Sequence, residues 1–138
     1  MLKLRQLITR NSIRSTLTNS HKELKMSAKE YTGVEDVLAK IQSYSDDFRP
    51  VAEQMHRIIM DSGGEVYPRL WYGMPGYAKT KTGPVLVYFR KDKYVTFGRT
   101  ESSRIEFDKG GNPVPTAWFF EDLNDASTTL IKDIAQLS

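Results

Sequence analysis

The chain has 138 residues, of which 39% are hydrophobic and 27% charged, a balance typical of a folded domain and not of a disordered chain. It contains no cysteine, which excludes disulfides, thiolate zinc sites, iron–sulfur ligation by this chain and cysteine nucleophiles. Its longest apolar runs, such as residues 85–89, are far shorter than the roughly 20 residues that a membrane-spanning helix requires. The length fits a single domain, and no association with a membrane is expected.

The formal net charge of +3 is concentrated at the N-terminus. Residues 1–25 carry six Lys or Arg residues and one acid, Glu23, so the remaining residues carry a net charge of about −2 by the same count. The basic character therefore belongs to this N-terminal leader and gives no indication that the rest of the chain binds nucleic acid, which we do not expect as a partner.

The leader itself, residues 1–25, has two interpretations. It is rich in Arg, Ser and Thr and has no acid before Glu23, which is the composition of a mitochondrial transit peptide. Alternatively, residues 22–26 can be encoded by a purine-rich stretch that resembles a bacterial ribosome-binding site and is followed by a start codon at Met26. In that case residues 1–25 are translated non-coding sequence. We favour the second interpretation, which predicts a cytoplasmic protein with one domain at residues 26–138, whereas the first predicts a mitochondrial one.

Two helices are predicted at the start of this domain. Thr32 and Glu35 have the spacing of a capping box, and apolar residues follow at helical intervals, namely Val34, Val37, Leu38, Ile41 and Tyr44. Residues 45–47 supply capping groups for a second apolar stripe, which consists of Phe48, Val51, Met55, Ile58 and Ile59 and ends at the glycines 63–64. Because almost no linker separates the two helices, we expect a tight corner or hairpin between them.

The segment 71–77 places three aromatic residues around two glycines and a proline. Gly73 and Gly76 permit backbone angles that other residues avoid, and Pro75 fixes its own φ. We therefore predict a sharp turn, which precedes the first clear strand. The aromatic side chains of such a turn either line a binding pocket or close one end of the core.

An antiparallel sheet is predicted after this turn. Residues 85–89 and 94–98 alternate around a turn at 91–92, which is typical of a β-hairpin. Residues 105–107 and 114–119 flank a Gly-, Asn- and Pro-containing loop at 108–113, which favours a second hairpin. Apolar residues at helical spacing predict a last helix over 123–137. The chain is thus predicted to be an α+β, two-layer domain, with an antiparallel sheet packed against an N-terminal helix pair and a C-terminal helix.

The tetrapeptide Tyr72-Gly73-Met74-Pro75, followed by the strand that opens at residues 84–89, resembles the YdhG-like family of small domains of unknown function. The resemblance extends from about Val34 to the C-terminus and implies the same order of elements. Some members of that family are similar to frataxin-type iron chaperones, which bind iron through surface carboxylates. The resemblance therefore implies iron as a cargo and iron–sulfur assembly proteins as partners, and it implies no catalytic residue.

Iron binding requires oxygen ligands clustered on one face. The best candidates are Asp46 and Asp47, which lie together at a predicted helix start, with Glu35 and Asp36 on the neighbouring helix. Glu53 and Asp61 are further carboxylates in the same region. The competing interpretation is structural, because acids at helix N-termini stabilise a helix by capping and through its dipole.

A ligand pocket is the alternative hypothesis. Its predicted residues are Trp71, Tyr72, Met74, Tyr77 and Arg90, and Lys79, Arg99 and Arg104 are further cations that could hold an anionic small molecule or the acidic segment of a protein. The competing interpretation is that cationic side chains on strands mark a solvated face or protect an exposed edge.

The sequence contains nothing that supports catalysis. His56 is the one histidine outside the leader, no phosphate-binding loop or nucleophile elbow is present, and Ser102 and Ser103 have no recognisable base partner. We therefore expect a non-enzymatic binding protein, with iron handling in the frataxin-like manner as the first hypothesis and an aromatic pocket for a small molecule or a protein as the second. The sequence does not indicate an oligomeric state.

Overall fold

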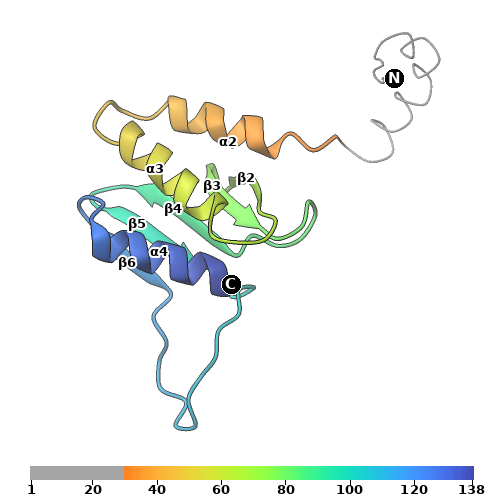
Figure 1. Ribbon diagram of the computed structural model, residues 1–138, viewed down its shortest axis with the longest axis vertical. Helices are drawn as coiled ribbons and strands as arrows, with labels where there is room; N and C mark the ends of the chain where they lie inside the picture. Colours follow the sequence, from red (N-terminus) through yellow and green to blue (C-terminus); the bar gives the residue numbers. More distant parts are fainter. Residues whose placement is uncertain (1–29) are drawn as a thin grey trace, which may run out of the picture. The chain divides into compact units, whose positions relative to one another are not determined.

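A computed structural model of the chain describes residues 30–138, of which residues 32–138 form one compact unit. The predicted leader, residues 1–25, lies outside the described residues. The described elements are shown in Figure 1 and are α2 (Gly33–Gln42), α3 (Arg49–Met60), β2 (Tyr67–Trp71), β3 (Met74–Ala78), β4 (Val87–Lys91), β5 (Val95–Arg99), β6 (Ala117–Phe120) and α4 (Asp125–Leu137). No helix among these residues is both long and apolar enough to cross a membrane.

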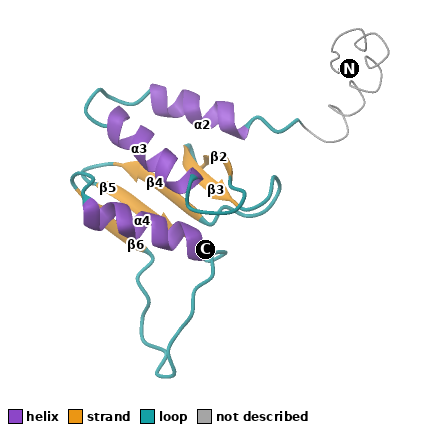
Figure 2. Ribbon diagram, viewed as in Figure 1, coloured by secondary structure: helices purple, strands orange, loops and turns teal. Residues whose placement is uncertain are grey.

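The five strands form one antiparallel sheet in the order β2-β3-β4-β5-β6, so each strand pairs with its neighbour in sequence. The helices lie together on one side of this sheet (Figure 2), and their buried side chains join those of the strands in a single core. The sequence-based prediction of an α+β fold with a helix pair, an antiparallel sheet and a C-terminal helix is confirmed.

The core is built by side chains that alternate along the strands. Tyr77, Phe89 and Phe97 point toward the helices and are fully or almost fully buried. Their helical partners in the core are Val37, Ile41, Ala52, Met55, Ile59, Ile131 and Ala135. Every second residue of the same strands therefore points to the opposite side of the sheet, where no helix of the described chain lies (Figure 2).

The helix starts differ from the predicted capping. Thr32 is the N-cap of α2, but its side chain does not cap the helix; its hydroxyl donates instead to the Asp36 carboxylate over 3.0 Å, so the predicted capping box with Glu35 is wrong. A capping box is present at α4. There Ser127 N–H donates to Asn124 Oδ1 and Asn124 N–H donates to Ser127 Oγ, both over 2.9 Å.

The strands differ from the prediction in two places. The segment 71–77, predicted to be a sharp turn before the first clear strand, belongs to a hairpin of β2 and β3 that pairs residues 67–71 with residues 74–78. The predicted strand at 105–107 is not formed; residues 100–116 are a long connection that includes a turn closed by Asn112 and Gly111 on Asp108. Only β6, at the end of this connection, returns to the sheet beside β5.

Candidate functional site

The hairpin that joins β2 to β3 has a two-residue turn at Tyr72 and Gly73, because Trp71 pairs directly with Met74. Both turn residues have positive φ, 52° for Tyr72 and 77° for Gly73, as a type I′ turn requires. Gly73 meets this requirement without cost, but Tyr72 is the only non-glycine residue with positive φ in the described chain. The turn thus holds a strained tyrosine at its tip, and that side chain is 85% exposed.

The face of the sheet that the helices leave open, called the open face below, is defined by two rows of residues that run across the strands. Cross-strand partners share a face, and the register joins Arg69, Gly76, Tyr88, Gly98 and Ala117 into one row. A second row contains Trp71, Met74, Arg90, Thr96 and Phe119, where continuation of the β3–β4 register aligns Met74 with Arg90.

Two glycines in the first row make room for two aromatic rings. A Cβ atom at Gly76 would lie 2.9 Å from both Trp71 Cβ and Val85 Cγ1, and one at Gly98 would lie 2.5 Å from the Tyr88 hydroxyl oxygen. The indole of Trp71 and the ring of Tyr88 stack with centroids 5.1 Å apart and planes inclined by 21°. Tyr72 meets the indole edge-on at 4.7 Å. The result is a cluster of three rings, Trp71, Tyr72 and Tyr88, that we call the aromatic platform.

The charge of the sheet is uniformly positive. The five strands contain four cationic residues, Arg69, Arg90, Lys91 and Arg99, and no acid. Arg69 and Arg90 belong to the open face. Arg90 forms an ion pair with Asp92 at 3.2 Å, in which both side chains are largely exposed, so solvent screens it and a ligand could replace it at little cost. Arg69 donates to the carbonyl of Gly83.

The predicted pocket residues are thus only partly brought together. Trp71, Met74 and Arg90 share one row of the open face, and Tyr72 stands at the adjoining turn. Tyr77 does not share this face. It lies on the helix side of the sheet, 2% exposed, with its hydroxyl 2.8 Å from His56 Nδ1 and its ring stacked on Phe89.

Burial shifts the pKa values of both Tyr77 and His56. Burial raises the pKa of the Tyr77 hydroxyl well above its usual value, and the nearby Tyr44 acts in the same direction. Burial also lowers the pKa of His56, as does the positive charge of Arg57. Both side chains are therefore kept neutral, and they serve the core instead of a ligand site.

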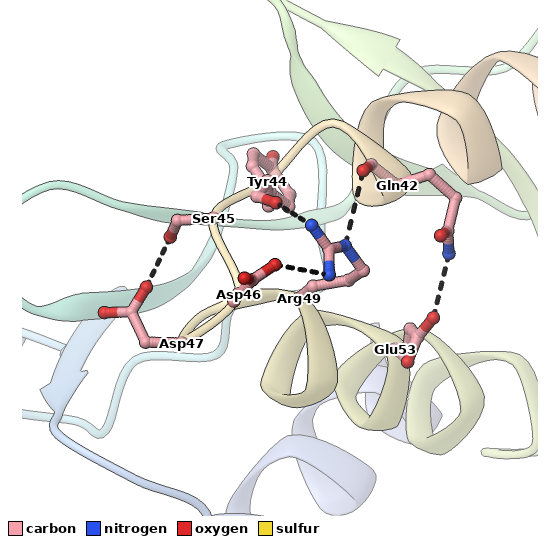
Figure 3. A network of polar contacts seen from close by, with 7 residues as sticks. All are labelled: Gln42, Tyr44, Ser45, Asp46, Asp47, Arg49 and Glu53. Carbon is pink, nitrogen blue, oxygen red and sulfur yellow. Dashed lines mark hydrogen bonds and ion pairs between the residues drawn. The ribbon is translucent and has the colours of Figure 1, made fainter.

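The four predicted iron ligands have other partners or stand apart. Asp46 forms an ion pair with Arg49 at 2.9 Å, and Arg49 also donates to the carbonyl oxygens of Gln42 and Tyr44 (Figure 3). Asp47 accepts a hydrogen bond from Ser45 and lies 3.2 Å from Lys91 Nζ, which together lower the pKa of its carboxyl group.

The remaining carboxylates do not complete a ligand set. The Asp36 carboxylate accepts a hydrogen bond from the Thr32 hydroxyl, and Glu53 accepts one from Gln42 at 2.8 Å. Glu35 lies on the exposed side of α2. Within residues 30–138 no group of three or more His, Cys, Asp or Glu side chains is arranged to hold a metal ion. The acids near the corner between α2 and α3 therefore hold that corner together through Arg49 and Lys91.

The other cations named from the sequence lie away from the open face. Lys79 donates to the carbonyl of Ala135 at the end of α4 over 3.3 Å, Arg99 packs over the ring of Trp118 and donates to Pro115, and Arg104 pairs with Glu106 in the long connection. A groove between α3 and α4 is lined mainly by polar and charged side chains, among them Arg57, Asp61 and Lys132. None of the residues that line this groove is aromatic.

Two aromatic residues of the open face were missed in the sequence analysis. Tyr88 precedes Arg90 by two residues and so had to share its face once the strand was recognised. Phe119, 68% exposed on β6, was assigned to a strand but not to a side. The signal available for both was the alternation of their strands together with Gly76 and Gly98.

Comparisons with protein-family models, curated proteins and solved structures found no match for this chain. The resemblance to the YdhG-like family therefore stays a prediction.

Proposed function

We propose that this chain is a non-enzymatic binding protein that holds a small planar aromatic anion on the open face of its sheet. The observation that carries the proposal is the stack of Trp71 on Tyr88 on the same face as Arg90. A planar ring would lie against the aromatic platform, and its negative group would exchange with Asp92 at the Arg90 guanidinium.

Four features of the face support this chemistry. Offset stacking on an indole adds to the free energy of burying apolar area, and a guanidinium offers two parallel donors to a carboxylate or phosphate. The strands present no acid that would repel an anion. Tyr72 adopts a positive φ, which costs conformational free energy, yet its side chain is exposed and adds nothing to the core. Backbone strain of this kind is typical of residues retained for recognition.

The iron-chaperone hypothesis has less support. Its best candidate ligands, Asp46 and Asp47, are each engaged by a cation, and no described carboxylate joins them in a three-residue cluster. Membership of the YdhG-like family remains compatible with either function, since that resemblance concerns the fold more than the chemistry.

The experiment is a titration followed by the indole N–H signals of the two tryptophans in ¹H–¹⁵N NMR spectra. Trp71 reports the open face and Trp118, which packs against the core, is the internal reference. Adenosine monophosphate, flavin mononucleotide and indole-3-acetate are the probes. We expect a saturable shift of the Trp71 signal with at least one of them and little change at Trp118.

Two variants test the roles of the residues. Tyr72→Ala should weaken binding because it removes one ring of the platform, and Arg90→Gln should weaken it because the anionic group loses its partner. Arg104→Gln is the matched control, since Arg104 has a similar exposed pairing with Glu106 in the long connection. Shifts confined to Trp118, or equal losses with Arg90→Gln and Arg104→Gln, would contradict the proposed site.

A further inference from the structure

The open face carries a second aromatic pair at its other end. The rings of Tyr94 and Phe119 lie with centroids 5.6 Å apart, and Lys93 Nζ lies 5.4 Å from the centroid of the Tyr94 ring. Tyr94 is 37% exposed and Phe119 68%. Phe119 is thus the exposed ring of β6, whereas Trp118 and Phe120 pack against the core. The pair of Tyr94 and Phe119 extends the stacking surface beyond what a single small ring can occupy.

The two aromatic groups lie on the same face of the sheet. Phe119 and Trp71 are at opposite ends of the second cross-strand row, four strand spacings apart, or about 19 Å at the usual spacing. Met74, Arg90 and Thr96 lie between them in that row, and the Thr96 side chain is buried, with 4% of its surface exposed. The row therefore has an aromatic ring at each end and the exposed Arg90 guanidinium between them.

Charge separates this surface from the rest of the domain. Two of the four strand cations, Arg69 and Arg90, belong to the open face and the strands carry no acid, whereas the three helices carry five acids and four cations. The net charge of about −2 outside the leader, from which no affinity for nucleic acid was expected, thus comes from the helices and connections. Two ring clusters with Arg90 between them and Lys93 beside the second match a ligand that has repeated planar groups and repeated negative charges.

We propose that the occupant of the open face is a single-stranded nucleic acid. This inference rests on the proposed function, because one base takes the place of the small planar ring on the aromatic platform. A second base stacks on Tyr94 and Phe119, and the phosphates between them lie beside Arg90, with Lys93 at the far end. A duplex keeps its base faces stacked within the helix, so it cannot use either aromatic group.

The experiment measures the fluorescence anisotropy of labelled oligothymidylate and oligouridylate strands of about ten nucleotides, within the site sizes known for such surfaces. The full chain is compared with Phe119→Ala, Tyr72→Ala and the matched control Phe107→Ala, which removes an exposed phenylalanine from the long connection. All four proteins share the basic residues 1–25, so differences between them report the face and not the leader. Circular dichroism checks that each variant is folded.

We expect Phe119→Ala to raise the Kd for the single strand by about fivefold to a hundredfold, the range of one lost base stack, and Phe107→Ala to leave it unchanged. Tyr72→Ala should weaken the same complex. Thymidine monophosphate, followed at the Trp71 indole signal, should bind the wild type and Phe119→Ala equally, since it occupies the first platform alone.

Other results would overturn the inference. They are equal affinity for duplex and single strand, equal affinity for oligoglutamate, or equal Kd values for Phe119→Ala and Phe107→Ala, which would assign the binding to the leader's charge. If any of these occurs while thymidine monophosphate still shifts the Trp71 signal, the small-molecule function stands and only the nucleic-acid inference fails. If no aromatic anion shifts Trp71 and the single strand leaves that signal unchanged, both fail.

Discussion

The two faces of the sheet both carry stacked aromatic rings, but only one of them is covered by helices. On the helix face Tyr77 stacks on Phe89 and Phe97 stacks on Trp118, and three helices cover these rings. On the open face Trp71 stacks on Tyr88 over two glycines, beside cations and without a helical cover. Ring stacking therefore occurs on both faces, and what distinguishes a core from a candidate binding surface is the cover and the charge around the rings.

The comparison is tested most strongly by removing one phenyl ring from each face. Phe97→Ala should lower the free energy of unfolding by about 3–5 kcal/mol, because Phe97 is fully buried and its loss leaves a cavity. Phe119→Ala removes an exposed ring and should change it by less than about 0.5 kcal/mol. Urea denaturation followed by circular dichroism measures both. Similar losses for the two variants would mean that the open face is a second core.

Substitution of Gly98, which lies beneath the Tyr88 ring, gives the next largest expected effect. Gly98→Ala should cost about 1–3 kcal/mol, because the new methyl group would lie 2.5 Å from the Tyr88 hydroxyl oxygen and displace the ring. The same substitution should cost much less in a Tyr88→Ala background, since the clash is then absent. A double-mutant cycle in urea measures this coupling. Additive effects would show that Gly98 does not support the Tyr88 ring.

The turn at the tip offers a prediction in which stability and binding change in opposite directions. Tyr72→Asn should raise the free energy of unfolding by about 1 kcal/mol, because Asn-Gly suits a type I′ turn and tolerates positive φ. It should also weaken binding of any ligand of the aromatic platform. Gly73→Val is the reference for strain, since φ is 77° there and a β-branched residue should destabilise the hairpin. A Tyr72→Asn variant no more stable than the wild type would contradict the assigned strain.

Much of this fold could be predicted from alternation and spacing, but the first hairpin could not. Pro68 and Pro75 argue against strands, because proline has no N–H to donate to a ladder. Both are tolerated here: β2 is at the edge of the sheet, and β4 pairs with β3 at Gly76 and Tyr77 but not at Pro75.

The same misassignment explains the one pocket residue that lies elsewhere. Met74 and Tyr77 are three residues apart, so they face opposite sides once the segment is a strand, whereas a turn leaves their directions open. The engagement of Asp47 could not be foreseen either, because its partner Lys91 is 44 positions away in sequence and reaches it only through the packing of the sheet. Local patterns fix faces within an element, and contacts between distant elements require the fold.

The smallest expected effect comes from the titratable pair on the helix face. His56 has a pKa lowered from 6.5 by burial and by Arg57, so the folded state favours its neutral form. The contribution of His56 to the free energy of unfolding is fully present above pH 6.5. It declines as the pH falls below this value, because His56 takes up a proton in the unfolded chain before it does so in the folded state. Tyr77, bonded to His56 at 2.8 Å, cannot offset this charge since burial raises its own pKa.

Urea denaturation of the wild type and of His56→Gln between about pH 5 and 8 measures this contribution. The difference between the two should narrow as the pH falls, because the variant has no imidazole to protonate at this position. A pH-independent difference would mean that the His56 imidazole is solvated well enough to charge in place, and that the helix face is less completely sealed from water than the stacking of Tyr77 on Phe89 implies.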